Sequence, residues 1–319
     1  MERATPLVSV IVPCFNAEAW IRDALKSVVD QDVTDLEVVV VDDGSTDDSA
    51  GIVEREFDRA VLVRTGNLGA SHARNVGTGM ARGSFVQYLD ADDVLAPGKL
   101  GVQLGVLQAA GADVAYGGWQ ELEHRPGDGF VPARVVDRRI GGDPEIELFT
   151  DFWCPPAAYL FRREVIERVG RWNDSLPIIQ DARFVLDCAL RGASFVYCPG
   201  VMAHYRVHGP SSLSRRDPSA FVRDCLRNAT EVEAWWMEHG GLSRARRAAL
   251  VKVYGYAARA SFERDPPAFE VAYQRLEALN PGYVPAAPRH LAAAARALGY
   301  RRAEALAVWY RRAKRLLRR

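Results

Sequence analysis

The stretch "VQYLDADDVL", residues 86 to 95, joins an apolar run directly to three carboxylates, Asp90, Asp92 and Asp93. Carboxylates prefer water, and three of them crowded together repel one another. A cap for the helix after Pro97 is the simpler explanation, but a cap needs only one of them. Hard cations such as Mg²⁺ and Mn²⁺ bind oxygen ligands, typically one or two carboxylates together with substrate phosphates. The stretch therefore predicts a strand that delivers carboxylates to a divalent cation and a phosphorylated ligand.

Short β-branched or aromatic runs alternate with helix-length amphipathic segments in the first part of the chain. The runs are "LVSVIV" (7–12), "LEVVVV" (36–41), "AVLVR" (60–64), "SFVQYL" (84–89) and "ADVAYGG" (112–118). Near-continuous apolar strands separated by helices indicate a parallel sheet covered on both faces. Ligands of such sheets collect beyond the carboxyl ends of the strands, so the polar residues at those ends are the candidate site.

The rest of the chain has a different pattern. It is irregular and rich in Pro and Gly from about 119 to 160, helices are expected again at 163–169 and 181–191, and two short strand-like runs follow, "SFVYC" and "HYRVH". From about 216 onward the chain is helical in pattern and rich in Arg and Ala. We therefore expect an α/β core, an irregular second half and a helical C-terminal extension.

Composition excludes several classes of function. The 319 residues have a formal net charge of zero, which implies no bulk preference for nucleic acid. The five cysteines are scattered without a CxxC pair, which argues against a disulfide framework or a structural zinc site and for a reducing compartment. The N-terminus has no signal-peptide pattern, and no apolar stretch approaches the roughly 20 residues that span a bilayer. We expect a cytoplasmic protein, soluble or peripheral on the inner face of the cell membrane.

Motifs at the strand ends narrow the chemistry. Neither GxGxxG nor GxxxxGK[ST] follows the first strand, which disfavours hydride transfer and P-loop ATP chemistry. The segment "DDGSTDDS" (42–49) suits a turn and a capped helix as well as a binding loop. In "TGNLGASHARNVG" (65–77), Arg74 supplies a fork of donors for a base or a phosphate, although a solvated helix arginine is the alternative.

Taken in order, these segments resemble glycosyltransferase family 2, inverting enzymes with the GT-A fold. The resemblance extends from about residue 7 to 214, and the segments are "VSVIVPCFN", "VVVDDGSTDDS", "NLGASHARNVG", "GSFVQYLDADD", "FRREVIERVGRWNDSL", "QDARFVLDCALRG" and "YRVHGPSSLS". It implies a mostly parallel, Rossmann-like sheet with flanking helices. The implied parts are a nucleotide-sugar-binding half (1–118), an acceptor-binding half with the catalytic base (119–215) and a helical extension (216–319).

The resemblance implies a nucleotide pocket. Pro13, Phe15 and Asp43 would form the base pocket, with Asp43 accepting a hydrogen bond from the base. Arg74 would reach the base or a phosphate from the helix that follows "NLG".

The resemblance also implies a metal site at the DxD motif. Asp92 would bind the metal directly, and Asp90 would face the ribose or a metal-bound water, with Asp93 as a third carboxylate. His208 would complete the metal or diphosphate site when the loop 208–216 closes, supported by Arg206, and an ordinary loop histidine is the alternative.

Asp181 matches the base of the family, which usually shows Glu-Asp before a helix where this chain has Gln180-Asp181. A positioned carboxylate that takes the acceptor proton contributes about 10²–10⁴-fold to the rate. The simpler alternative is that Asp181 favours the N-terminus of its helix. The departure at Gln180 puts the orientation of the acceptor in question.

The expected partners follow from the same resemblance: a UDP-, GDP- or dTDP-sugar donor, and a glycan, lipid-linked or small-molecule acceptor. Trp119, Trp153 and "CPP" (154–156) would shape the acceptor side, unless the tryptophans are core residues. A nucleotidyltransferase and a non-catalytic sugar-nucleotide-binding module are the competing functions. A nucleotidyltransferase would typically carry a Gly-rich loop after its first strand, and this chain has no such loop. A non-catalytic module is disfavoured because Asp181 and the metal carboxylates are present.

The C-terminal segment 289–319 carries ten Arg or Lys residues and one acid, Glu304. Leu306, Trp309, Leu316 and Leu317 recur at helical spacing, whereas Val308 falls on the basic side. A basic amphipathic helix of this kind can lie in an anionic membrane interface. The alternative is that the apolar stripe packs on the catalytic domain or on a second copy in a homodimer.

Overall fold

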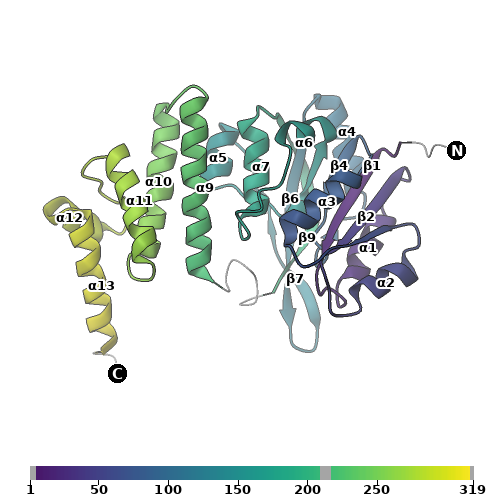
Figure 1. Ribbon diagram of the computed structural model, residues 1–319, viewed down its shortest axis with the longest axis horizontal. Helices are drawn as coiled ribbons and strands as arrows, with labels where there is room; N and C mark the ends of the chain where they lie inside the picture. The colour runs from purple at the N-terminus through teal and green to yellow at the C-terminus, as the bar shows by residue number, and fades with distance from the viewer. Residues whose placement is uncertain (1–4, 209–216, 317–319) are drawn as a thin grey trace. The chain divides into compact units, whose positions relative to one another are not determined.

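The computed structural model describes residues 5–208 and 217–316 of the chain. The chain divides into two compact units, Met1–Ser212 and Leu213–Arg319 (Figure 1). The first unit is mixed α/β and the second is helical, which confirms the α/β class and the helical C-terminal extension expected from the sequence.

Nine strands form one sheet within the described residues, in the order β3-β2-β1-β4-β8-β6-β9-β5, with β7 paired to β6. The first part is parallel and consists of β3 (Val61–Arg64), β2 (Leu36–Asp42), β1 (Val8–Cys14) and β4 (Phe85–Tyr88). The second part is mixed: β8 (Tyr159–Arg162) is antiparallel to both of its neighbours, β6 (Val114–Arg125) is parallel to β9 (Phe195–Val207), and β5 (Val94–Leu95) is antiparallel to β9.

The parallel part explains why the apolar runs are almost continuous. Strand β1 lies between β2 and β4, and all but one of its residues are buried, because helices cover both faces of such a sheet. The helices that connect these strands are α1 (Ile21–Val29), α2 (Ser49–Glu56), α3 (Ala70–Met80) and α4 (Lys99–Ala110). Gly77 allows α3 to approach β1, since a Cβ there would lie 2.4 Å from the Ile11 side chain.

Residues 119 to 160 are more regular than their sequence indicated. Strand β6 continues to Arg125 and returns through β7 (Gly129–Val136) as a hairpin. Strand β7 contains Pro132 and has no buried residue, so it lacks the apolar pattern of a core strand. In the described residues it pairs with β6 only, and an edge strand tolerates a proline. Helix α5 (Pro144–Thr150) and the short helix η1 (Pro156–Ala158) follow.

The last elements of the first unit are α6 (Arg163–Val169), α7 (Gln180–Leu190) and β9. The two strand-like runs expected from the sequence are one strand, β9, whose register to β6 shifts where Gly117 pairs with Cys198 and Gly118 with Val201. Pro199 and Gly200 are accommodated in that bulge, which is why the sequence appears to break there.

The second unit consists of α9 (Pro218–Glu238), α10 (Arg244–Ser261), α11 (Pro266–Leu279), α12 (Arg289–Leu298) and α13 (Tyr300–Leu316). Three of these helices begin at a side-chain cap, from Asp217, Ser243 and Asp265 respectively. Trp236 and Tyr254 are fully buried in its core. Among the described residues, no helix has the length and apolar character needed to cross a bilayer.

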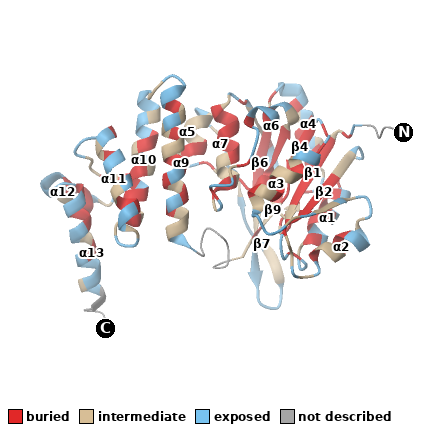
Figure 2. Ribbon diagram, in the orientation of Figure 1, coloured by how far each residue is buried: buried red, intermediate tan, exposed pale blue. Residues whose placement is uncertain are grey.

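Helix α13 packs with the face opposite to the one that the sequence suggested. Tyr300, Ala303 and Val308 are buried, whereas Leu306 and Trp309 are 49% and 68% exposed. Figure 2 shows exposed residues along much of this helix. Leu306 and Trp309 of the predicted apolar stripe are therefore not on the packing face, where Val308 lies instead. The side chains of Leu316 and Leu317 lie outside the described residues.

Candidate active site

The three carboxylates after β4 lie in different surroundings. Asp93 is buried, and one of its oxygens accepts a hydrogen bond of 3.0 Å from the backbone N–H of Arg206 on β9. Burial, together with the charges of Asp92 and Asp90, raises the pKa of Asp93 well above its ordinary value. Asp93 therefore ties the turn to β9, and Asp90 and Asp92 are the two carboxylates that face outward.

Arg74 links the end of β4 to the beginning of α7. Its guanidinium is 2% exposed, forms an ion pair with Asp90 and donates a hydrogen bond to the side-chain oxygen of Gln180. It also lies 4.5 Å from the centroid of the Trp172 ring. Burial raises the pKa of Asp90, the ion pair with Arg74 opposes that rise, and the nearby Asp92 adds to it. The solvated-arginine alternative for Arg74 is thus wrong.

Asp181 lies in the first turn of α7, next to Gln180. One of its oxygens accepts a hydrogen bond of 2.8 Å from the N–H of Ala182, and the other accepts one of 2.8 Å from the indole N–H of Trp153. Since Arg74 holds both Gln180 and Asp90, the site brings Asp181 and the β4 carboxylates to one region of the first unit.

Asp92 and His208 are in contact. The Nε2 atom of His208 lies 2.9 Å from Oδ2 of Asp92, and both side chains are partly exposed. The imidazole ring packs against Trp20 and Phe130, with ring centroids 5.5 Å away in each case, and these two rings also contact each other. The hairpin formed by β6 and β7 supplies Phe130, so a segment that looked irregular in the sequence reaches this part of the site.

Arg206 stabilises the turn after β4 that carries Asp92. Its guanidinium donates to the carbonyl oxygen of Asp92 at 3.1 Å and pairs with Asp23 of α1 at 2.6 Å. The charge also lies over the rings of Trp20 and Phe130. Arg206 thereby fixes the backbone that carries Asp92.

The predicted base pocket lies at the ends of β1 and β2. Asp43 is buried, and its oxygens accept hydrogen bonds from the backbone N–H groups of Leu68 and Gly69 and from the Thr65 hydroxyl, at 2.6 to 2.8 Å. These bonds hold the loop that leads into α3, and a carboxylate with about four lone-pair sites retains room for one more donor. Pro13 is half-buried in β1, and the Phe15 ring beyond it is 46% exposed.

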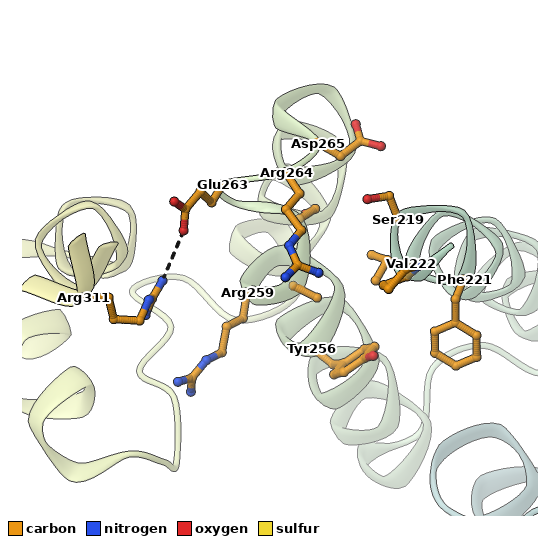
Figure 3. Close-up of a pocket in the computed structure, with 12 residues that line it drawn as sticks. Ser219, Phe221, Val222, Tyr256, Arg259, Glu263, Arg264, Asp265 and Arg311 are labelled. Carbon is orange, nitrogen blue, oxygen red and sulfur yellow. Dashed lines mark ion pairs between the residues drawn. The ribbon is translucent and has the colours of Figure 1, made fainter. Parts of the chain in front are cut away.

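The loop 208–216, predicted to close over the diphosphate, lies outside the described residues except for His208. A hollow in the second unit, lined by Arg259, Arg264, Glu263 and Arg311 among others, contains none of the predicted site residues (Figure 3).

Comparison with known proteins identifies the family. The sequence model described as Glycosyl transferase family 2 matches residues 9–170. The chain belongs to glycosyltransferase family 2. Its match includes the strand ends and the carboxylates after β4 but ends before Asp181 and His208.

A curated relative agrees with this assignment, and solved structures share the fold. The uncharacterized glycosyltransferase EpsJ of Bacillus subtilis (strain 168) is 27% identical over 252 residues, which cover 75% of this chain and 72% of EpsJ. The structure of S. aureus TarS 1-349 in complex with UDP-GlcNAc has a TM-score of 0.66 at 21% identity, covering 96% of this chain and 92% of that one. Mannosyltransferase PcManGT from Pyrobaculum calidifontis, in complex with GDP-Man and Mn²⁺, has a TM-score of 0.57 at 22% identity, covering 94% and 86%. The predicted GT-A fold is confirmed, and the chain is a glycosyltransferase.

Sequence reasoning missed several residues around the family 2 site. These residues have no local sequence signal beyond their apolar or charged character. They are Trp20 and Phe130, which contact His208, Asp23, which pairs with Arg206, and Trp172, which lies under Arg74. For Trp153 the sequence leaves the acceptor side and the core as alternatives, and nothing in it indicates the hydrogen bond to Asp181.

Proposed function

We propose that the protein transfers a sugar from a nucleotide-diphosphate sugar to an acceptor hydroxyl, with inversion at the anomeric carbon and dependence on a divalent cation. In this proposal Asp181 removes the proton of the acceptor hydroxyl as that oxygen attacks from the face opposite the diphosphate. Pro13, Phe15, Asp43, Arg74 and Asp90 bind the nucleotide, with Arg206 bracing the turn that carries Asp92.

One observation carries the proposal: Arg74 bonds both to Asp90 on the donor side and to Gln180, the neighbour of Asp181. A transferase must hold donor and base in one geometry, and positioning of this kind removes much of the entropic barrier to reaction. Because Gln180 is neutral, the Arg74 charge is paired with Asp90 and not shared with a second carboxylate. This supports Gln180 as a hydrogen-bonding replacement for the family's usual glutamate.

The residues present suit a divalent cation. Asp92 and His208 offer a carboxylate oxygen and an imidazole nitrogen in contact, and both are partly exposed toward a ligand. Among the described residues no three His, Cys, Asp or Glu side chains group into a metal site, so donor phosphates would supply further ligands, as is usual for Mg²⁺ and Mn²⁺. When bound, such a cation neutralises charge on the departing diphosphate. The PcManGT complex, which contains GDP-Man and Mn²⁺, supports the same proposal.

The proposal assigns donor binding and acceptor binding to different parts of the chain. Residues 1–118 would bind the donor, residues 119–215 the acceptor, and residues 216–319 form the helical extension. The complexes of TarS with UDP-GlcNAc and of PcManGT with GDP-Man support a nucleotide-sugar donor. The five cysteines are free thiols in the structure, which supports a reducing, cytoplasmic location.

Helix α13 is proposed to contact an anionic membrane. Leu306, Trp309 and Tyr310 are exposed on it, and Arg302 and Lys314 are exposed on the same helix. An aromatic anchor with basic neighbours suits the interface of a bilayer. A lipid-linked acceptor would make such contact useful.

The test is release of nucleoside diphosphate from UDP-GlcNAc and from GDP-Man, with Mn²⁺ and with a chelator. We expect Mn²⁺-dependent turnover of one donor, with the sugar released first as the anomer opposite to that of the donor. Asp181→Asn should bind the donor normally and lose turnover by about 10²–10⁴-fold, because the amide cannot accept the proton. Asp32→Asn is the control, since Asp32 accepts a backbone hydrogen bond from Gly101, outside the predicted site. Turnover by Asp181→Asn within about tenfold of wild type would point to another base.

A further inference from the structure

Trp153 occupies a defined place between the aromatic core and α7. It lies in the segment that joins α5 to η1 and is half-buried. Its ring meets Trp119 of β6 edge-to-face at a centroid distance of 5.7 Å, and Tyr205 of β9 at 5.5 Å. Contacts from two different strands restrict rotation of the indole, so the direction of its N–H is set by the sheet.

That N–H is aimed at Asp181. The indole nitrogen lies 2.8 Å from Oδ2 of the carboxylate, while Oδ1 accepts from the N–H of Ala182, also at 2.8 Å. One donor on each oxygen fixes the plane of the carboxylate. A carboxylate has about four lone-pair sites, so two remain for an incoming hydroxyl.

We propose that Trp153 is a positioning residue for the Asp181 carboxylate, holding it in the orientation that accepts the proton of the acceptor. This inference rests on the proposed function of Asp181 as the base. A base must lie within hydrogen-bond reach of the proton that it removes, and a misplacement of about 1 Å can lower a rate by about 10²-fold. The backbone donor of Ala182 alone leaves the carboxylate free to swing about that single bond.

Trp119 provides a matched control. Trp119 is 3% exposed, which makes it a core residue and not part of an acceptor-binding surface. Its ring contacts Trp153 edge-to-face, but among the described side chains its indole N–H has no hydrogen-bond partner. Trp153→Phe and Trp119→Phe therefore each remove one indole N–H and replace the indole with a smaller phenyl ring. They differ in whether the lost N–H held Asp181.

The kinetic test uses the full chain with Mn²⁺ and whichever of UDP-GlcNAc and GDP-Man it turns over. We expect Trp153→Phe to lower kcat about 10- to 100-fold while the donor KM stays within about twofold, because only the base is displaced. Trp119→Phe should keep kcat within about threefold, because the phenylalanine ring still packs against Trp153 and only an N–H without a described partner is lost. The double variant Trp153→Phe/Asp181→Asn should be no slower than Asp181→Asn alone, since two residues that act as a unit are not additive. Equal kcat for Trp153→Phe and Trp119→Phe, or a double variant in which the two losses multiply, would overturn the proposal.

A spectroscopic readout separates this proposal from the proposed function. The indole N–H resonance of Trp153, assigned by its loss in Trp153→Phe, should move in Asp181→Asn, and that of Trp119 should not. If the Trp153 resonance does not move, the hydrogen bond is absent in solution and the positioning role fails, whatever the turnover. If it moves but Asp181→Asn turns over donor like wild type, then the base is elsewhere and the proposed function fails with the positioning role.

Discussion

The ion pair between Arg74 and Asp90 should stabilise the first unit, and the burial of its two side chains sets the size of the effect on the free energy of unfolding. Arg74→Met removes the charge and leaves Asp90 without its partner. Removing one member of a buried pair costs about 3–5 kcal/mol, but the Asp90 side chain is 27% exposed, so water compensates in part and we expect about 2–3 kcal/mol. For a unit of this size, 1 kcal/mol corresponds to about 2–4 °C in melting temperature, which predicts a fall of about 4–12 °C.

The measurement is the thermal unfolding of Arg74→Met beside that of Arg55→Met. Arg55 pairs with Asp48 at 2.5 Å, but these side chains are 59% and 56% exposed. Exposed pairs contribute about 0–1 kcal/mol, so this control should melt close to the wild type despite its short distance. Adding Asp90→Asn to Arg74→Met should recover part of the loss, because the unpaired charge is then removed. Equal melting temperatures for Arg74→Met and Arg55→Met would refute the argument from burial.

Three further predictions concern the metal, the pH dependence of the second unit and the membrane. Asp92→Ala should abolish Mn²⁺-dependent binding of UDP-GlcNAc or GDP-Man with little loss of folding; calorimetry that finds unchanged metal-dependent affinity contradicts the site. Burial raises the pKa of Glu304, which faces Arg259, Tyr300 and Arg311, so the charged form is disfavoured in the folded state. Its contribution to stability is thus complete below the ordinary value of 4.5 and is lost as pH rises through the raised pKa. Glu304→Gln should gain in melting temperature over wild type as pH rises above 4.5, and a pH-independent difference would count against this. The full chain should sediment with anionic vesicles at low salt and not at high salt, and Trp309→Glu should weaken this binding more than Met237→Glu, a control at a similarly exposed residue of α9; equal binding by both variants would favour a protein partner, such as a second copy.

Much of the parallel part of the sheet could be predicted from the sequence, because its signals are local. A central strand buried on both faces appears as an unbroken apolar run, and the polar residues that follow it mark where ligands bind. The cluster at Asp90, Asp92 and Asp93 was predicted on this basis, whereas Asp181 was identified only through the resemblance to the family. The hairpin of β6 and β7 was missed, since an exposed edge strand with a proline lacks that pattern.

The sequence by itself determined which polar residues follow which strand, and only the tertiary structure decided which of them meet. Arg74 bonds to Gln180 across 106 positions, and His208 meets Asp92 across 116. Such pairs depend on the order of the strands in the sheet, where β8 and β6 separate β4 from β9. Periodicity specifies the buried face of an element but not its neighbour in space. The hydrogen bond from Trp153 to Asp181 has the same origin, because the packing of two strands against one indole sets the direction of its N–H.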